Sequence, residues 1–448
     1  MLKLFDPLLG NLGAARIDMA PARYGLVTAC DGGLLEVSGL AVPVGAICRV
    51  AHGTGDGIAA ETIGFRNGRT LMMLLGDTVM LRPGARVRPE GHPGMLAVGD
   101  AYLGRAVDGE GHAIDGGGAI RAQTFWPAGG KRSGALDRSP VRERFEVGVR
   151  ALDALTTLGV GQRIGVIAGS GVGKSVLIDM IAAGAEAEIV VVGLIGERAR
   201  EVSDFVERHM GAGHMGAGRR ERTAIVAVPA DHAPNLRLRG ALLATSMAEH
   251  FRAQGKRVLL IMDSLTRVAH AAREIGLLLG EPGAARGYPP SALATITKLV
   301  ERAGNSGASG GSITGLYTVL ADGDNQDDPV VDTARAILDG HVVLSRDLAQ
   351  RGQYPAIDIA ASLSRVMNDI VTPEHQALAR EFRALSASYE ANRDLLLMGA
   401  YRAGTDPQLD RAIAMHVALT GFLVQPQHQS VRFGDSLGAL RSVLGHGG

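Results

Sequence analysis

The 448-residue chain contains very little cysteine and few aromatic residues. Its only cysteines, Cys30 and Cys48, are too few for a disulfide framework and lack the spacing of metal-ligand pairs. Because disulfides are characteristic of oxidising compartments, we expect a protein of the reducing cytoplasm. Aromatic residues make up only 4% of the chain, so the core must consist mainly of Ala, Val, Leu and Ile.

The chain also lacks net charge and long apolar runs. Lys and Arg total 46, as do Asp and Glu, and this balance argues against a general polyanion binder. The longest apolar runs, Ile189–Ile195 and 258–262, are of strand length, whereas a transmembrane helix needs about 18 residues. The N-terminus has neither the basic start nor the apolar stretch of a secretory signal. These absences indicate a soluble intracellular protein.

Hydrophobic residues make up 46% of the chain, enough for a large core, and the length predicts two or three domains. Residues 1–22 have apolar positions at helical spacing but are interrupted by Pro and Gly. They favour a loosely ordered tail, with a helix that folds on a partner as the alternative. Residues 23–92 alternate short apolar stretches with Gly, Asn and Pro turns, which predicts a small β-barrel.

The rest of the chain is predicted to form a P-loop ATPase domain over 93–370 and a helical domain over 371–448. In the former, near-continuous apolar strands alternate with helical patterns, which is typical of a parallel sheet covered on both faces. The expected strands are Arg163–Ala168, Ile189–Ile195, 224–228, 258–262, Ser312–Leu320 and 341–344. Helices are expected at 176–183, 241–253, 374–397 and 408–423.

The strongest local signal is a phosphate-binding loop, Ala168-Gly169-Ser170-Gly171-Val172-Gly173-Lys174-Ser175, followed by Val176 at the start of a helix. Its glycines allow backbone N–H groups to face phosphate oxygens, and the next helix adds its positive N-terminal dipole. Lys174 is expected at the β- and γ-phosphates and Ser175 at Mg²⁺. The usual first glycine is replaced by Ala168.

Two carboxylates follow other apolar strands. Asp263 ends the run 258–262 at the edge of the sheet where ligands bind, and it is predicted to hold Mg²⁺ directly or through water. Glu197, in Gly196-Glu197-Arg198, could polarise the attacking water. On the residues alone, a surface glutamate paired with an arginine is an equally good interpretation of Glu197.

These motifs together resemble one family. In order, they are the P-loop, Gly196-Glu197-Arg198, Asp263-Ser264-Leu265-Thr266-Arg267, Gly287-Tyr288-Pro289-Pro290-Ser291, Gln353-Tyr354-Pro355 and Ser362-Leu363-Ser364-Arg365. They are similar to those of the catalytic subunits of rotary ATP synthases. Within that superfamily, the blocks at 311–320 and 337–346 resemble the flagellum-specific, type III protein-export ATPases.

The resemblance implies roles for individual residues. Glu197 matches the catalytic carboxylate, with Arg198 beside it and Arg267 after the metal-binding aspartate. Tyr354 matches the aromatic residue that packs on adenine, with an ordinary core tyrosine as the alternative. Arg365 matches the arginine finger that reaches the γ-phosphate of the adjacent subunit, with a structural arginine as the alternative.

Two segments depart from the family pattern. Gln425-Pro426 is followed by Gln427 instead of a second adenine-packing aromatic, which leaves Tyr354 with less stacking support and predicts weak base selectivity. The segment 208–222, rich in His, Gly and Arg, is expected to be a solvated loop. A metal site from His209, His214 and His232 is the less favoured alternative.

By resemblance, we expect an Mg²⁺-dependent ATP hydrolase that energises bacterial flagellar protein export as a homohexameric ring. The alternatives are a virulence-secretion ATPase, an ATP-synthase subunit and an RNA-translocating ring; the balanced charge and sparse aromatics of 24–92 disfavour specific nucleic-acid binding. The expected partners are a regulator at the N-terminal tail, a coiled-coil stalk, a membrane export gate, chaperones and export substrates. This implies a cytoplasmic protein peripheral to the inner membrane.

Overall fold

The computed structural model describes residues 23–53, 57–76, 81–122, 124–131, 134–211, 217–321 and 328–446. It divides into two compact units, one ending at Pro93 and the other running from Gly94 to the C-terminus. The N-terminal tail and His214 lie outside the described residues, so the predictions made for them stay predictions. No helix in the described part of the chain is long and apolar enough to cross a membrane.

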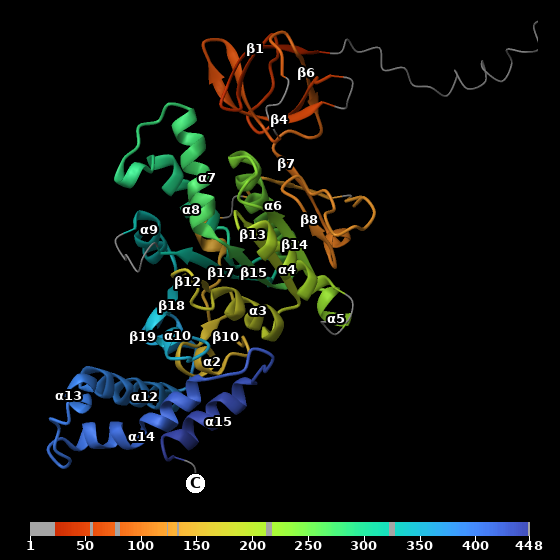
Figure 1. Ribbon diagram of the computed structural model, residues 1–448. Coiled ribbons are helices and arrows are strands. Elements are labelled where there is room, and N and C mark those ends of the chain that lie inside the picture. The colour runs from red at the N-terminus through yellow and green to blue at the C-terminus, as the bar shows by residue number, and fades with distance from the viewer. Residues whose placement is uncertain are drawn as a thin grey trace, which may run out of the picture. The chain divides into compact units, whose positions relative to one another are not determined.

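The first unit is a closed six-stranded barrel, as the turn-rich pattern predicted (Figure 1). Its strand order is β1-β2-β5-β4-β3-β6, with bounds β1 Gly25–Asp31, β2 Leu34–Ser38, β3 Ile47–Val50, β4 Ile58–Arg66, β5 Arg69–Leu74 and β6 Arg86–Glu90. Asn67 and Gly68 join β4 to β5 with φ of 50° and 72°, and this pair of positive φ angles is what a two-residue hairpin requires. Small apolar side chains such as Val37, Cys48 and Ala60 fill the barrel.

The second unit contains a nine-stranded sheet. Its order is β19-β18-β12-β17-β15-β13-β14-β8, and β16 pairs separately with β17. The strands are β8 Ala106–Val107, β12 Arg163–Ala168, β13 Ile189–Ile195, β14 Thr223–Val228, β15 Arg257–Asp263, β16 Gly304–Asn305, β17 Ser312–Leu320, β18 Gly340–Leu344 and β19 Ile357–Ser364. All six predicted strands are therefore present and parallel. The antiparallel edge strand β19 was not predicted.

Smaller strands and helices surround the sheet. Two short pairs are β7 Met95–Val98 with β9 Thr124–Pro127, and β10 Arg144–Phe145 with β11 Leu158–Gly159. The helices of the core are α2 Arg150–Leu155, α3 Lys174–Gly184, α4 Ala199–Met210, α5 Ala217–Arg220, α6 Pro234–Ala253, α7 Leu265–Leu278, α8 Pro290–Val300, α9 Pro329–Ile337, α10 Arg346–Gln350 and α11 Met367–Ile370. Helix α6 packs on β13, β14 and β15. The prediction of a loop over 208–222 was wrong for 208–210, which belong to α4, and for 217–220, which form α5.

The C-terminal segment is helical, as predicted. It comprises α12 Pro373–Ala391, α13 Arg393–Leu397, α14 Pro407–Leu423 and α15 Phe433–Val443, of which α12, α14 and α15 pack against one another (Figure 1). The single helix expected over 374–397 is broken at Asn392, whose φ of −108° and ψ of 7° are not helical. Phe382 and Phe422 belong to the same apolar core as Ile164 of the sheet, so these helices share the core of the ATPase fold.

Candidate nucleotide-binding and catalytic site

The predicted phosphate loop connects a buried strand to an exposed helix start. Strand β12 ends at Ala168, and α3 begins at Lys174 after Gly173, whose φ is 90°. Gly171 also has a left-handed φ of 78°, a conformation that glycine adopts without the usual steric cost. Ser170, Gly171, Ser175 and Val176 are exposed, whereas Val172 is buried. The loop therefore offers backbone donors and a helix N-terminus to an anion from outside.

Lys174 lies between two carboxylates. Its Nζ donates a hydrogen bond to Oδ1 of Asp263 and lies 3.4 Å from Oε1 of Glu197. Residues Leu194 and Asp263 are paired on the adjacent parallel strands β13 and β15, which explains why the two acids meet at one edge of the sheet. Thr318 on β17 also donates to Oδ1 of Asp263, over 2.6 Å. The P-loop, Glu197 and Asp263, predicted from separate motifs, thus form one cluster.

Burial and charge shift the protonation equilibria of this cluster. Burial raises the pKa of Glu197 above its ordinary value, Asp263 raises it further, and Lys174 opposes both effects. Burial opposes the charge of Lys174, but the charges of Asp263 and Glu197 outweigh burial and raise the Lys174 pKa. Two acids and one base in a small buried volume therefore leave Glu197 as the carboxylate that holds a proton more readily than an exposed glutamate.

A glycine turn directs Glu197 into the cluster. Gly196 has a φ of 70°, and a Cβ at this position would lie 2.7 Å from Cβ of Arg267, so a larger residue does not fit. The Glu197 carbonyl accepts a hydrogen bond from Ala230 N at 3.1 Å, which fixes the backbone after the turn. Glu197 is 9% exposed, so the alternative of a surface glutamate is not what the structure shows.

The two arginines predicted near this cluster differ in their positions. The Arg198 side chain is 83% exposed and lies 3.7 Å from Glu201, so the structure does not bring it to the cluster. Arg267, in the first turn of α7, packs against Gly196, and its Nε is buried without a hydrogen-bond partner in the described structure. A buried unpaired donor is costly, and a ligand atom at this position would satisfy it.

A cavity of about 130 Å³ opens beside the cluster. It is lined by Ser175, Glu197 and Asp263, and also by Glu201, Asp204 and Arg208 of α4. Positions 201, 204 and 208 follow helical spacing and share one face of α4, a pattern the sequence analysis did not use. Hydroxyl and carboxylate oxygens are the ligands that Mg²⁺ prefers, so the chemistry of this donor set fits the cation predicted for Ser175 and Asp263.

Tyr354 lies beside the phosphate loop. A Cβ at Gly173 would be 3.5 Å from two atoms of the Tyr354 ring, yet the tyrosine is 43% exposed. The alternative of an ordinary core tyrosine is therefore wrong. Its carbonyl accepts a hydrogen bond from Gln425 N at 3.0 Å, and the exposed Gln427 is hydrogen-bonded to His428. One aromatic face is available near the loop, and the Gln-Pro segment lies next to it.

Arg365 lies at the amino ends of the parallel strands, whereas the phosphate loop of its own chain lies at their carboxyl ends. It follows Ser364, which pairs with Gly340 at the start of β18, and β18 runs parallel to β12. At about 3.3 Å per residue, the length of β12 from Arg163 to Ala168 separates these two edges by roughly 16 Å. The Arg365 side chain is exposed, and its guanidinium donates a hydrogen bond to the carbonyl of Arg335 at 3.2 Å.

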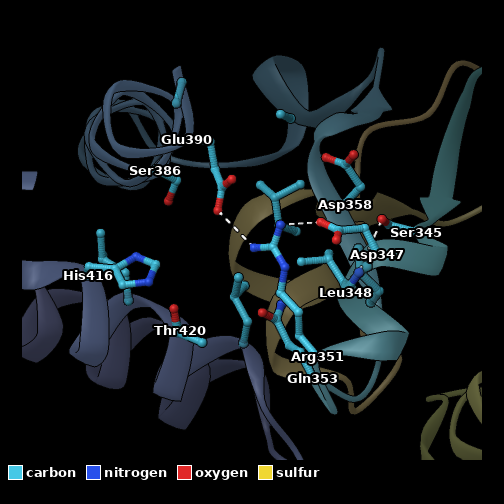
Figure 2. Close-up of a pocket in the computed structure, with 16 residues that line it drawn as sticks. Ser345, Asp347, Leu348, Arg351, Gln353, Asp358, Ser386, Glu390, His416 and Thr420 are labelled. Carbon is cyan, nitrogen blue, oxygen red and sulfur yellow. Dashed lines mark hydrogen bonds and ion pairs between the residues drawn. The ribbon is translucent and has the colours of Figure 1, made fainter. Parts of the chain in front are cut away.

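A second cavity, of about 270 Å³, lies where α10 and β19 meet α12 and α14 (Figure 2). Arg351 is at its centre, paired with Asp347 of α10 and 3.4 Å from Glu390 of α12. His416 faces the same space and stacks on Tyr389. This cavity contains no residue of the phosphate loop and connects the sheet to the C-terminal helices.

The histidines proposed for a metal site have other partners. His209 is 2.9 Å from Asp179 and stacks on Phe205, and His232 is 3.4 Å from Asp231. Among the described residues, the candidate metal group is instead Asp108, Glu110 and His112. The described structure therefore gives no support to the histidine site.

Comparisons with known proteins cover nearly the whole chain. A family model described as the ATP synthase alpha/beta family, nucleotide-binding domain, matches residues 148–364, and one described as the T3SS EscN ATPase C-terminal domain matches 371–442. The flagellum-specific ATP synthase of Pseudomonas aeruginosa is 46% identical, covering 98% of this chain and 97% of its own length. That of Salmonella typhimurium is 47% identical, with 96% of each chain covered.

Secretion ATPases are also similar. The type 3 secretion system ATPase of Xanthomonas euvesicatoria is 42% identical over 94% of each chain. The solved structure of the assembled ATPase EscN from enteropathogenic E. coli superposes with a TM-score of 0.87 at 37% identity, covering 94% of this chain and 100% of EscN. A further structure contains assembled EscN with its central stalk EscO, at a TM-score of 0.85 and 36% identity.

Proposed function

We propose a function for this chain, which belongs to the ATP synthase alpha/beta family and, within it, groups with the flagellum-specific ATP synthases. The protein hydrolyses ATP and thereby energises flagellar type III protein export. The observation that carries this proposal is the buried cluster of Lys174, Glu197 and Asp263 beside the phosphate loop. A P-loop lysine and a carboxylate of raised pKa are what γ-phosphate transfer to water requires.

Nucleotide binding changes the partners of this cluster. Gly169, Ser170, Gly171, Val172 and Gly173 bring backbone groups to the β- and γ-phosphates, with Ser175 and Val176 at the helix start. Lys174 exchanges its carboxylate partners for phosphate oxygens, since both are anionic. Glu197, released from Lys174, then accepts a hydrogen bond from the attacking water.

The reaction is in-line displacement at the γ-phosphorus. Glu197 takes a proton from the water as the new O–P bond forms and the bond to the β,γ-bridging oxygen breaks, which leaves ADP and phosphate. Ser175 and Asp263 are the residues that would hold Mg²⁺, which neutralises charge on the phosphates. Arg267, with its unpaired Nε, supplies a further donor at this edge. We assign Arg198 to the rim of the site, since it is exposed.

The active form is an assembly in which Arg365 of one subunit serves the next. Arg365 lies roughly 16 Å along the sheet from its own phosphate loop, so a nucleotide that it contacts belongs to a neighbour. A chain that carries a loop at one edge and an arginine at the other can close head-to-tail into a ring. The assembled state of EscN supports this arrangement, and we infer six subunits by family resemblance.

Partners and location follow the same inference. The EscN–EscO complex supports a central stalk partner for this chain. We further propose a regulator at residues 1–22, chaperones, export substrates and a membrane export gate, with the enzyme in the cytoplasm at the inner membrane. No nucleic acid is proposed.

A virulence-secretion role is the second candidate, because the T3SS C-terminal model and the Xanthomonas relative both match. The flagellar relatives named above have the higher identity, 46% and 47% against 42%. A synthase subunit is less favoured because residues 371–442 match the secretion-type C-terminal model.

Phosphate release and motility test the proposal. The purified chain should release phosphate from ATP, whereas Glu197→Gln should lose most of this activity while still binding nucleotide. Expression in Salmonella that lacks its flagellum-specific ATP synthase should restore swimming, with Lys174→Ala as the inactive control. Equal phosphate release by the wild type and Glu197→Gln would refute the catalytic assignment. Rescue of secretion in Xanthomonas, without rescue of swimming, would favour the virulence role.

A further inference from the structure

We propose that Gln162 and Asp339 are positioning residues that hold Arg365 where the neighbouring nucleotide can reach it. With Arg163 and Ser364 they form a hydrogen-bonded group, here called the Asp339 junction, between the start of β12 and the end of β19. The inference rests on the proposed use of Arg365 by the next subunit.

The backbone at Arg365 is held from two sides. Arg365 N donates to the carbonyl of Asp339 at 2.9 Å, and Gln162 Nε2 donates to the same carbonyl at 3.1 Å. Gln162 Nε2 also donates to Oγ of Ser364, the preceding residue, at 3.1 Å. The Gln162 amide thus joins Asp339 to Ser364 at the point where the chain leaves β19.

The side chain of Asp339 binds this corner to the strand that leads to the phosphate loop. Its Oδ2 accepts from Arg163 N and from Arg163 Nε, each at 3.0 Å, and its Oδ1 accepts from the same guanidinium at 3.0 Å. Asp339 N returns a hydrogen bond to the Arg163 carbonyl at 2.8 Å. Arg163 and Asp339 are therefore joined through both their backbones and their side chains. Arg163 also forms an ion pair with Glu301 at 2.6 Å.

Burial fixes the Gln162 and Ser364 part of the junction. Gln162 is 0% exposed, Ser364 is 8% exposed, and Gln162 Oε1 is satisfied by Gly159 N at 2.9 Å. A buried amide whose donor and acceptor both have partners is held in one geometry, because displacing it leaves an unsatisfied buried group. The Arg163 and Asp339 side chains, 19% and 26% exposed, are held by their paired hydrogen bonds. The Arg365 guanidinium, by contrast, is exposed and, among the described residues, donates to the carbonyl of Arg335 at 3.2 Å. The base of the side chain is fixed, and its tip is available to a neighbour.

Positioning of this kind affects the rate more than nucleotide affinity, because the arginine acts on charge that grows in the transition state. We expect Gln162→Met and Asp339→Asn to lower kcat roughly 10- to 100-fold, as a displacement of about 1 Å can do, and to change KM for ATP much less. Thr314→Val is the matched control. It removes the buried hydroxyl that accepts a hydrogen bond from the adjacent Gly161 N, without touching Asp339 or Ser364, so kcat should stay near wild type.

Mixing subunits separates misplacement of the arginine from damage to the chain's own site. Glu197→Gln chains cannot hydrolyse ATP but keep an intact junction and Arg365. When mixed with Gln162→Met chains in equal amounts, they should restore about half of the wild-type rate per Gln162→Met chain, since random rings give about half of those chains an intact donor. Arg365→Ala mixed with Glu197→Gln is the positive control.

Each outcome has a distinct meaning. Rescue in both mixtures supports the junction as a positioning device. Rescue of Arg365→Ala without rescue of either junction variant overturns the inference, as does a wild-type kcat in both junction variants alone. Failure of the Arg365→Ala mixture overturns the proposed intersubunit arginine itself, and the inference with it. Thermal melting shows whether each variant folds. If one of the two junction variants, Gln162→Met or Asp339→Asn, does not fold, the other is used in its place.

Discussion

At the scale of the residue, the site balances one lysine against two acids. Lys174, Glu197 and Asp263 are each about one-tenth exposed or less, so their charges interact with little solvent screening. Asp263 has two hydrogen-bond donors, Lys174 and Thr318, whereas Glu197 has one longer contact to Lys174. This asymmetry makes Asp263 the fixed acid, suited to a cation, and Glu197 the acid that can exchange a proton.

The raised pKa of Glu197 predicts the acid limb of the reaction. As a base, Glu197 must be ionised, so kcat/KM should fall with decreasing pH through a pKa above the ordinary glutamate value of 4.5. The measurement is kcat/KM from pH 5 to 9. Glu207→Gln, which removes an exposed acid from α4, the helix that follows Glu197, should leave the limb in place. A rate that does not change down to pH 5 would contradict the assignment.

Tyr354 predicts weak base selectivity. Base stacking on an aromatic ring contributes about 1–3 kcal/mol, so Tyr354→Ala should raise KM for ATP by about tenfold, whereas Tyr354→Phe keeps the ring and should be near wild type. Because Gln427 stands where the family has a second aromatic, we expect KM values for ATP and GTP to differ by less than about tenfold. A strong preference for ATP that survives Tyr354→Ala would show that other residues read the base.

At the scale of the element, the strands that could be predicted are those whose sequence is one uninterrupted apolar run. β12, β13 and β17 match their predicted bounds because parallel strands buried on both faces are uninterrupted apolar runs. β19 was missed because it lies at the sheet edge and contains Ala and Ser, and α15 because its apolar residues are widely spaced.

The motifs that meet in the Lys174–Glu197–Asp263 cluster could likewise be recognised in the sequence, because each lies within a few residues of a strand end. The Asp339 junction was not, since Gln162 and Ser364 are 202 residues apart in the chain and only the folded sheet brings them together. Arg198 is the opposite case, a residue predicted at the cluster that does not lie there. Its motif is intact, but Arg198 is the N-cap residue of α4 and its side chain points away from the cluster into solvent. Neighbours in sequence do not fix the direction of a side chain.

Asp153 of α2 predicts a pH-dependent stability. Its carboxylate accepts from Val147 N and Gly148 N, yet burial raises its pKa from 3.8 to about 8. Because the folded state binds this proton more tightly than the unfolded state, its stabilising effect is complete below pH 3.8 and is lost as pH rises towards 8. The melting temperature of the wild type, compared with Asp153→Asn, should therefore decline between pH 5 and 8. A constant difference would refute the shift.

At the scale of the whole molecule, strand β19 connects two sites. Tyr354 precedes its first residue and lies at the phosphate-loop edge, whereas Arg365 follows its last residue at the opposite edge. If Arg365 serves the next subunit as proposed, the same strand lies between the nucleotide of its own chain and that of the neighbour. β12 adds a second connection, because Arg163 at its start is hydrogen-bonded to Asp339 and Ala168 at its end leads into the phosphate loop.

Shared sites make the enzyme sensitive to defective neighbours, and two inactive chains should differ in this effect. Excess Glu197→Gln/Arg365→Ala chains, mixed with a trace of wild type, supply no arginine finger and cannot use the one that wild type offers, so they should lower the rate per wild-type chain by roughly 10³-fold or more. Excess Glu197→Gln chains supply that arginine and should leave most of the rate intact. The measurement is phosphate release per wild-type chain at a fixed total protein concentration. If both diluents have the same effect, Arg365 does not act between subunits, because only the source of the arginine distinguishes the two mixtures.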